Sequence, residues 1–171
     1  YIFKKYLTDF TDAEIQYCTD NAYSTKNFET ESIAEISELF DGTYMLELWH
    51  GPTCAFKDFG ARFMARVMSY FNRGEDTNLH ILVATSGDTG SAVGSAFHNV
   101  PGIDVTILYP DGKISPLQEK QLSTFDGNVR ALKVKGTFDD CQKLVKTAFT
   151  DTELRSKFRL SSANSINISR L

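Results

Sequence analysis

Apolar side chains recur at spacings of three and four residues around and after Lys57, at Phe56, Phe59, Phe63, Val67 and Phe71. This spacing places them on one face of a helix, so it predicts a helix that begins near Lys57 and ends at about Asn72. Lys57 is therefore expected at the start of a helix, among apolar and small residues.

Three short runs of almost wholly apolar residues also stand out: HILVAT at 80–85, VTILYP at 105–110 and VRALKV at 129–134. Such runs are typical of strands that are buried on both faces of a parallel sheet. A further compact apolar run, YMLELW at 44–49, predicts one more strand.

Helical segments alternate with the three buried strands: AVGSAFHN, residues 115–125 and residues 137–149. Ser115 is predicted to cap the second of these helices, with Gln118 closing a capping box, and Thr137 to cap the third. Strands that alternate with helices in this way predict a parallel sheet joined by right-handed crossovers.

The N-terminal part is predicted to be helical. TDAE at 11–14 has the form of a capping box and opens a helix that runs through Tyr23. SIAEISELFDG, residues 32–42, resembles a second helix that ends at a glycine.

These elements together predict an α/β protein with a three-layer architecture, in which a parallel or mostly parallel sheet is flanked by helices. Residues 1–43 would form a helical N-terminal region and residues 44–171 an α/β portion. The stretch 161–171 is polar and rich in small residues, and it supplies no closing element. The α/β portion is therefore expected to be truncated on its C-terminal side.

Composition excludes several classes of function. With 42% hydrophobic and 23% charged residues in a chain of 171, the protein matches an ordinary globular domain rather than a disordered one. A net charge of −4 without a basic stripe gives no support to nucleic-acid binding. No signal peptide or membrane-length apolar run is recognisable, so we expect no membrane association.

Cysteines and histidines suggest neither a disulfide framework nor a metal site. The three cysteines, Cys18, Cys54 and Cys141, are odd in number, far apart and without ligand spacing. Reduced thiols in a cytoplasmic protein are the simplest interpretation. The histidines, His50, His80 and His98, are equally dispersed, so no metal site and no Ser/His/Asp triad is predicted.

SGDTG, residues 86–90, follows directly after a predicted buried strand. Ligands of open parallel sheets bind beyond the carboxyl ends of the strands, and the start of a helix presents free N–H groups and a partial positive charge. An anion, either a carboxylate or a phosphate, is the natural ligand. Taken alone, the stretch is equally consistent with a tight, well-capped turn. It is neither a dinucleotide fingerprint nor a nucleotide phosphate loop.

Lys57 also permits two interpretations. A lysine at the start of a helix is usually solvated, and the helix dipole disfavours an ammonium there. The same dipole and apolar neighbours favour a neutral amine, which is able to form a Schiff base with an aldehyde. On spacing alone, the surface interpretation remains the more common one.

The two stretches together carry a resemblance to a known family. HGPTCAFKDFG at 50–60, followed by ATSGDTGSA at 84–92, is similar to threonine synthases of the bacterial and fungal branch, within the tryptophan synthase β-like (fold type II) family of pyridoxal-phosphate enzymes. The similarity continues through LYPDGKISPLQEKQL and SANSINISR. It covers the chain from about Tyr44 to its end, and more loosely the first forty residues.

The resemblance implies a role for particular residues. Lys57 matches the lysine that holds pyridoxal 5'-phosphate as a Schiff base and shuttles protons. The loop that receives the substrate α-carboxylate is matched by Ser86, Gly87, Asp88, Thr89 and Gly90. The residues that hold the substrate phosphate are matched by Asn164, Ser165 and Arg170.

Asp88 departs from the wider family, where an Asn amide reaches the phenolic oxygen of the cofactor. A carboxylate would repel that oxygen unless it is protonated or turned away, although the threonine synthase branch itself carries SGDTG. The family's Gly-Asn-Phe-Gly type loop for the cofactor phosphate and the residue that contacts the pyridine nitrogen are not found in this segment. The segment alone is therefore expected to be inactive or nearly so.

The reaction implied by the resemblance converts O-phospho-L-homoserine and water to L-threonine and phosphate. A threonine synthase-like phospho-lyase that releases a keto acid would share these motifs. A third possibility is a non-catalytic module that binds an anion at SGDTG, in which Lys57 would be dispensable. The sequence indicates a small-molecule substrate and leaves the oligomeric state open.

Overall fold

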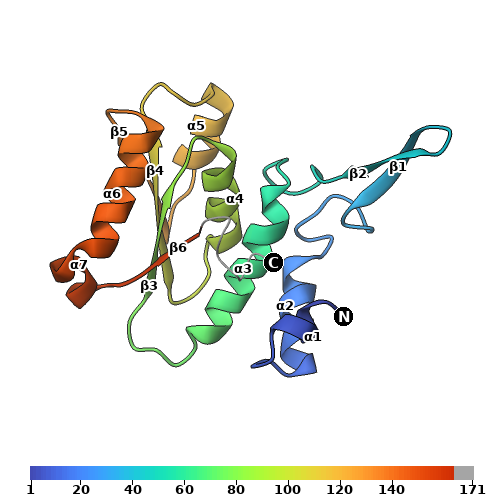
Figure 1. The fold of residues 1–171 in the computed structure, drawn as a ribbon, viewed down its shortest axis with the longest axis horizontal. Coiled ribbons are helices and arrows are strands. Elements are labelled where there is room, and N and C mark those ends of the chain that lie inside the picture. Colours follow the sequence, from blue (N-terminus) through green and yellow to red (C-terminus); the bar gives the residue numbers. More distant parts are fainter. Residues whose placement is uncertain (164–171) are drawn as a thin grey trace.

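A four-stranded parallel sheet forms the centre of the protein in the computed structural model, which describes residues 1–163 (Figure 1). Its strands, in the order β5-β4-β3-β6, are Val129–Val134, Ile103–Pro110, Leu79–Ala84 and Arg159–Ser162. The predicted α/β fold and parallel sheet are confirmed. Strand β5 has the predicted bounds, whereas β4 begins two residues earlier than predicted.

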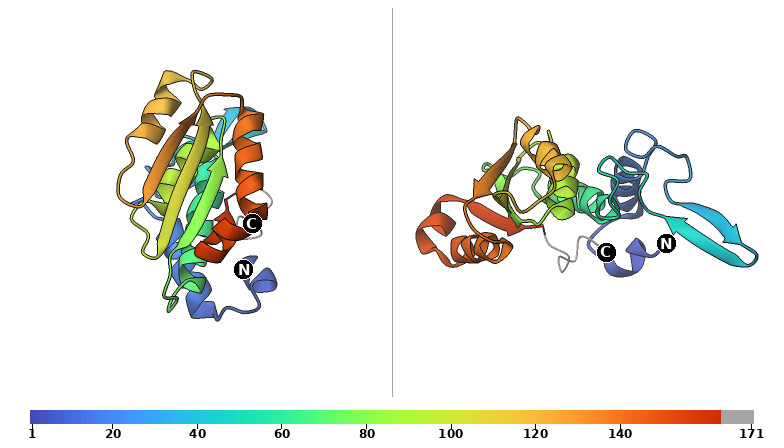
Figure 2. Two further views of the ribbon diagram at one scale, coloured as in Figure 1. Left: turned by 90° about the vertical axis from the view of Figure 1, so that its left-hand side faces the viewer. Right: turned by 90° about the horizontal axis from the view of Figure 1, so that it is seen from above.

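Helices cover both faces of the sheet and make the predicted three layers (Figures 1 and 2). One face is covered by α3 (Lys57–Phe71), α4 (Asp88–Phe97) and α5 (Pro116–Ser123), and the other by α6 (Phe138–Thr150) and α7 (Thr152–Lys157). The chain steps from β3 to β4 to β5, then returns to the far side of β3 to form β6. Because parallel crossovers are right-handed, this reversal moves the connecting helices to the opposite face.

The predicted capping boxes are present at three helices. In each case the cap hydroxyl accepts a hydrogen bond from the N3 backbone N–H, and the N3 side chain bonds back to the cap. The caps are Thr11 for α2 (Asp12–Ala22), Ser115 for α5 and Thr137 for α6. These local signals explain why the starts of these helices are predictable from sequence.

The predicted helix over residues 32–42 is wrong, because this stretch contains strand β1 (Glu35–Phe40). It pairs antiparallel with β2 (Thr43–Glu47) in a hairpin that projects from the body of the molecule (Figures 1 and 2). The turn is Asp41-Gly42, with Gly42 at φ +73°, and Asp-Gly is a strong hairpin signal. The glycine ends a strand rather than a helix.

The N-terminal helices are joined to the body by an apolar cluster. Helix α1 (Phe3–Tyr6) and α2 pack on the outer side of α3, where the ring of Phe3 stacks on Phe63 at 3.9 Å. The buried members of the cluster are Phe10, Ile15, Cys18, Ala22, Phe63 and Val67. A boundary at residue 43 would divide the β1–β2 hairpin; the division of the chain into two regions remains a prediction.

The main core lies between the sheet and the helices α3 and α4. Its largest fully buried side chains include Met64, Phe97, Ile81, Ile103 and Ile107. On the opposite face, a cavity of about 280 Å³ remains between the sheet and α6 and α7. No helix within residues 1–163 is long and apolar enough to cross a bilayer.

Candidate active site

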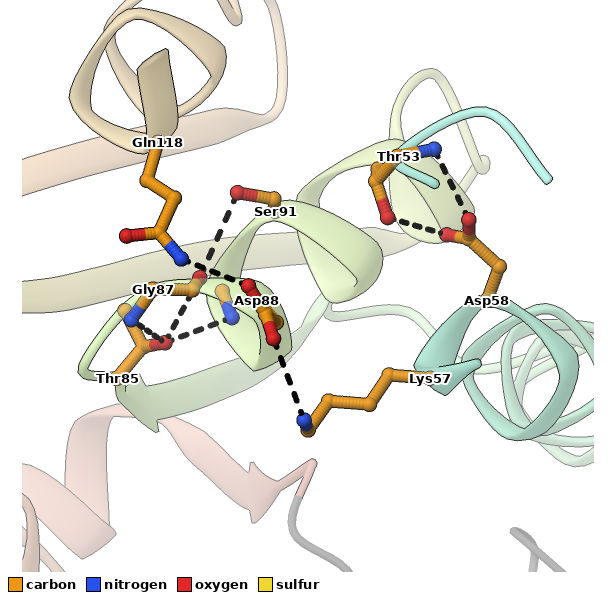
Figure 3. A network of polar contacts seen from close by, with 9 residues as sticks. Thr53, Lys57, Asp58, Thr85, Gly87, Asp88, Ser91 and Gln118 are labelled. Atoms are coloured by element: carbon orange, nitrogen blue, oxygen red, sulfur yellow. Dashed lines mark hydrogen bonds and ion pairs between the residues drawn. The ribbon is translucent and has the colours of Figure 1, made fainter. Parts of the chain in front are cut away.

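Lys57 is the first residue of α3, as predicted, and its side chain extends toward the start of α4 (Figure 3). The Nζ atom lies 3.7 Å from Oδ2 of Asp88 and 4.5 Å from the centre of the Phe56 ring. The side chain of Lys57 is 25% exposed, so it is not sealed inside the protein. The predicted apolar neighbourhood is thus present on one side, while a carboxylate occupies the other.

The SGDTG loop begins immediately beyond the carboxyl end of β3, and α4 starts at Asp88. Thr85, which is 1% exposed, organises this loop: its Oγ1 accepts hydrogen bonds from the backbone N–H groups of Gly87 and Gly90 at 3.0 and 2.9 Å. The hydroxyl in turn donates to the Gly87 carbonyl at 3.1 Å. One buried side chain therefore satisfies three backbone groups of the loop.

Two glycines are required for this geometry. Gly87 has φ +146°, a conformation that L side chains rarely adopt. A Cβ at Gly90 would lie 2.5 Å from Cγ2 of Thr85. The close packing of Gly90 on Thr85 brings the first turn of α4 against the end of β3.

The N-terminus of α4 retains capacity to bind an anion. Within residues 1–163, no group accepts a hydrogen bond from the backbone N–H of Asp88 or of Thr89. These donors and the positive end of the helix dipole suit a carboxylate or phosphate. Lys57 adds an amine to the same edge of the sheet, which combines a nucleophile with an anion site.

Asp58 holds the segment before α3 against the helix. Its carboxylate is fully buried and accepts hydrogen bonds from the backbone N–H of Thr53 at 2.9 Å and from the Thr53 hydroxyl at 2.8 Å. A Cβ at Gly51 would lie 2.5 Å from Asp58 Oδ2, so only glycine permits this approach. These contacts restrain the backbone on both sides of Lys57.

Arg62 continues this polar layer one turn further along α3. It is 7% exposed and donates to Oδ1 of Asn27 at 2.9 Å and to the hydroxyl of Ser95 at 3.0 Å. Burial lowers the pKa of its guanidinium, and the Asp58 carboxylate partly offsets this effect. Arg62 thereby connects the N-terminal segment, α3 and α4.

The structure brings together only part of the predicted site. Lys57 and the loop from Ser86 to Gly90 lie at one edge of the sheet, whereas Asn164, Ser165 and Arg170 lie outside the described residues. Strand β6 ends at Ser162 beside Leu82 of β3, on the same edge.

Sequence reasoning missed two contributors, Asp58 and Gln118. Asp58 is adjacent to Lys57 in the FKD motif, and an acid in the first turn of a helix is ordinarily solvated. Gln118 was predicted only as a capping residue, yet its Nε2 also donates to Oδ1 of Asp88 at 2.7 Å. No sequence signal indicates this second contact, because the two residues belong to different helices.

One group of side chains within the described part of the chain has the proximity of metal ligands. Glu35, Glu47 and His50 place ligand atoms within 4.8 Å of one another, on the hairpin and the segment after it. His50 Nε2 and Glu47 Oε2 already contact each other at 2.6 Å. The group includes none of the predicted site residues, and the absence of a metal remains a prediction.

The amine of Lys57 beside the start of α4, whose N–H groups are unpaired within residues 1–163 and suit an anion, is the arrangement expected for a cofactor that carries an aldehyde and anionic groups. A family model described as "Pyridoxal-phosphate dependent enzyme" matches residues 33–169. The chain belongs to this family of pyridoxal-phosphate dependent enzymes. The residues present fit the cofactor, because a reachable lysine and free backbone donors lie at one edge.

Within that family, the similarity is to threonine synthases. The chain is 50% identical over 169 residues to the threonine synthase of Buchnera aphidicola, covering 98% of this chain and 39% of that protein. The crystal structure of yeast threonine synthase matches with a TM-score of 0.86 at 36% identity, covering 96% of this chain and 34% of that one. Pyridoxal-phosphate-bound threonine synthase from Brucella melitensis matches with a TM-score of 0.84 at 40% identity, covering 92% and 34%. The chain thus spans less than half the length of these relatives.

Proposed function

We propose that this chain is the part of a threonine synthase that carries the Schiff-base lysine, and that the whole protein converts O-phospho-L-homoserine and water to L-threonine and phosphate. The observation that carries this proposal is the convergence of Lys57 Nζ and the start of α4, where Asp88 lies 3.7 Å from the amine. The similarity to threonine synthases over nearly the whole chain supports the choice of reaction.

Lys57 has two roles in this proposal. Pyridoxal phosphate, which Lys57 would hold, would supply an electron-withdrawing ring that makes the protons of the amino acid substrate acidic. When it is not bound to the cofactor, the Lys57 amine would serve as the base for those protons. Its place at the start of α3 suits this role, because the helix dipole disfavours an ammonium there. The Asp58–Thr53 contacts restrain the backbone that presents it.

The substrate would be held by its two anionic ends. The backbone N–H groups of Asp88 and Thr89 would bind its α-carboxylate, together with the rest of the loop from Ser86 to Gly90. Asn164, Ser165 and Arg170 would bind its phosphate, for which the guanidinium fork is well suited. The latter three follow β6, whose carboxyl end lies at the same edge of the sheet as the loop.

Asp88 would contact the cofactor from the side of the Lys57 amine. Its Oδ1 is occupied by the Gln118 amide and its Oδ2 faces Lys57, so the carboxylate is already oriented by two partners. In this orientation it would stabilise positive charge on the Lys57 nitrogen, which opposes the effect of the helix dipole at the start of α3. This arrangement provides a reason for Asp at a position where many relatives carry Asn.

A cytoplasmic location fits the cysteine chemistry. Cys18, Cys54 and Cys141 are all free, and Cys54 is also exposed. Exposed free thiols are typical of proteins that stay in a reducing compartment. We therefore propose that the enzyme is cytoplasmic. We also propose a small-molecule substrate and, because a net charge of −4 comes without a basic stripe, no nucleic-acid partner.

The first test asks whether Lys57 binds the cofactor. The full-length protein that carries these residues would be mixed with pyridoxal phosphate and reduced with borohydride, and the modified peptide would be located by mass spectrometry. We expect the label on Lys57. In Lys57→Ala we expect both the label and threonine formation to be lost. Lys157→Ala is the matched control, because Lys157 is likewise a helical lysine paired with a carboxylate, Glu153, at 2.6 Å.

Different outcomes separate the candidate functions. Label spread over surface lysines, with anion binding intact in Lys57→Ala, would indicate a non-catalytic binding module instead. Label on Lys57 with a keto acid as the main product would indicate a phospho-lyase. The segment 1–171 by itself, assayed in parallel, is expected to be inactive or nearly so.

A further inference from the structure

Gln118 makes two hydrogen bonds with the two ends of its side-chain amide, and Figure 3 shows the one to Asp88. Its Oε1 accepts from the backbone N–H of Ser115 at 3.2 Å, which closes the capping box of α5. Its Nε2 donates to Oδ1 of Asp88 at 2.7 Å. This orientation of the amide is the only one that satisfies both partners, because a backbone N–H only donates and a carboxylate only accepts.

The Gln118 contact determines which way the Asp88 carboxylate faces. With Oδ1 bonded to Gln118, the remaining oxygen, Oδ2, is the one that lies 3.7 Å from Lys57 Nζ. The Asp88 side chain is 51% exposed, so little packing would otherwise hold it. A hydrogen bond to a charged group is stronger than an ordinary one, and is sufficient to select one rotamer.

The loop itself is shaped to allow this contact. A Cβ on Gly87 would lie 2.3 Å from Nε2 of Gln118, so any side chain at this position would displace the amide from Asp88. The backbone of Gly87 therefore passes directly beneath the Gln118 side chain. Three segments of the chain, namely α5, the SGDTG loop and α3, meet at this contact.

We infer that Gln118 is a positioning residue: it holds the Asp88 carboxylate toward Lys57 and thereby stabilises positive charge on the Lys57 nitrogen. This inference rests on the proposed function, in which that nitrogen binds the cofactor. Gln118 bonds to Asp88 and to Ser115, and within residues 1–163 it makes no hydrogen bond to the Lys57 amine or to the backbone N–H groups of Asp88 and Thr89.

The test uses the pH dependence of the visible absorption of cofactor bound at Lys57, measured on the full-length protein. Gln118→Met keeps the length of the side chain and removes both the donor to Asp88 and the acceptor for the Ser115 N–H, so the Asp88 carboxylate is free to turn away. Charge on the nitrogen is then less stabilised, and the absorption change should move to lower pH by about one unit. The catalytic efficiency should fall by about 10- to 100-fold.

Ser115→Ala is the matched control, because it removes the cap of α5 and leaves the Gln118–Asp88 bond in place. Its pH profile should equal that of the unmodified protein. In the Asp88→Asn background, Gln118→Met should cause no further shift, since the effect passes through the carboxylate. If Gln118→Met fails to fold, Gln118→Glu preserves the capping box, and repulsion between the two carboxylates should still displace the profile.

The inference is overturned if Gln118→Met and Ser115→Ala have the same pH profile, if the shift persists in the Asp88→Asn background, or if a folded Gln118→Glu keeps the original profile. Failure of the proposed function is a separate result. In that case borohydride leaves Lys57 unlabelled even in the unmodified protein, and the positioning role is lost with it.

Discussion

At the scale of single residues, the site depends on two buried polar side chains, Thr85 and Asp58, which hydrogen-bond to groups within five residues of themselves. Thr85 is the clearest case, because its one hydroxyl serves the backbone at both Gly87 and Gly90. Similarly, the Asp58 carboxylate accepts hydrogen bonds from both the backbone N–H and the hydroxyl of Thr53. Such groups stabilise the fold only while every partner is present, since an unpaired buried donor is costly.

Thr85→Val should therefore destabilise the protein although it conserves the shape of the side chain. Two buried N–H groups lose their acceptor, and we expect the free energy of unfolding to fall by about 2–4 kcal/mol. Denaturant unfolding would measure this change. Thr106→Val in β4 is the control, because the Thr106 hydroxyl has no hydrogen-bond partner within residues 1–163. This substitution should therefore change the free energy of unfolding very little. Equal losses in both variants would contradict the role given to Thr85.

At the scale of elements, α2 is joined to α3 by apolar contacts and by part-buried hydrogen bonds, one of them from the Tyr70 hydroxyl to Glu14. The hydroxyl of Tyr23, which follows the last residue of α2, donates to the carbonyl of Phe59 at 3.1 Å. Burial raises the pKa of Tyr23 from 10.0 to about 12. The docking of α2 should therefore respond to alkaline pH.

The direction of this response follows from the pKa of Tyr23 in the unfolded chain, 10.0, and in the folded protein, about 12. Below pH 10 the phenol is protonated in both states; between 10 and 12 only the unfolded state loses its proton, so stability falls as pH rises. The expected loss is about 2–3 kcal/mol across this interval. Tyr23→Phe should lack this loss while being about 1 kcal/mol less stable at neutral pH. If the free energy of unfolding fell equally with pH in both proteins from pH 9 to 12, the loss could not be attributed to Tyr23.

The elements that could be predicted from sequence are those whose signals are local. Capping boxes at Thr11, Ser115 and Thr137 and the apolar run of β5 are contained within a few residues. For strand β1 the sequence predicts a helix instead, because the apolar residues of this stretch also fit a helical spacing. Strand β6 has only four residues, too few to show a periodic pattern.

The site was predictable to the same extent. Lys57 and the SGDTG loop lie within continuous motifs, and the rule for parallel sheets places a ligand at that edge. The Gln118–Asp88 contact joins residues thirty positions apart, and the Asp58–Thr53 contact depends on the close approach allowed by Gly51. Contacts of this kind appear only once the chain is folded.

At the scale of the whole molecule, Phe63 joins the N-terminal helices to the α/β body. Its ring is 2% exposed and lies between Phe3, with centroids at 3.9 Å, and Tyr23, at 6.3 Å. Both partners come from the first 23 residues, while Phe63 belongs to α3, which also presents Lys57. The cluster thus couples the N-terminal segment to the helix that carries the reactive amine.

Phe63→Ala should lower the free energy of unfolding by about 3–5 kcal/mol. It should also let α1 and α2 detach from α3 before the sheet unfolds. Hydrogen exchange would then show early loss of protection in α2 and retained protection in β3 and β4. Phe71→Ala, in the same helix at a position 57% exposed, should have a much smaller effect. Simultaneous loss of protection in α2 and the sheet would mean that the two parts unfold as one unit.

The place of β6 in the sheet has a consequence for biosynthesis. Strands β3, β4 and β5 are neighbours in both sequence and space, so they are able to pair as they leave the ribosome. The side of β3 that faces away from β4 has no partner strand until Arg159–Ser162 has been translated. Until then the backbone N–H and C=O groups on that side are open to pairing with another chain. A nascent chain paused after β5 would therefore expose this side of β3 to aggregation until synthesis resumed.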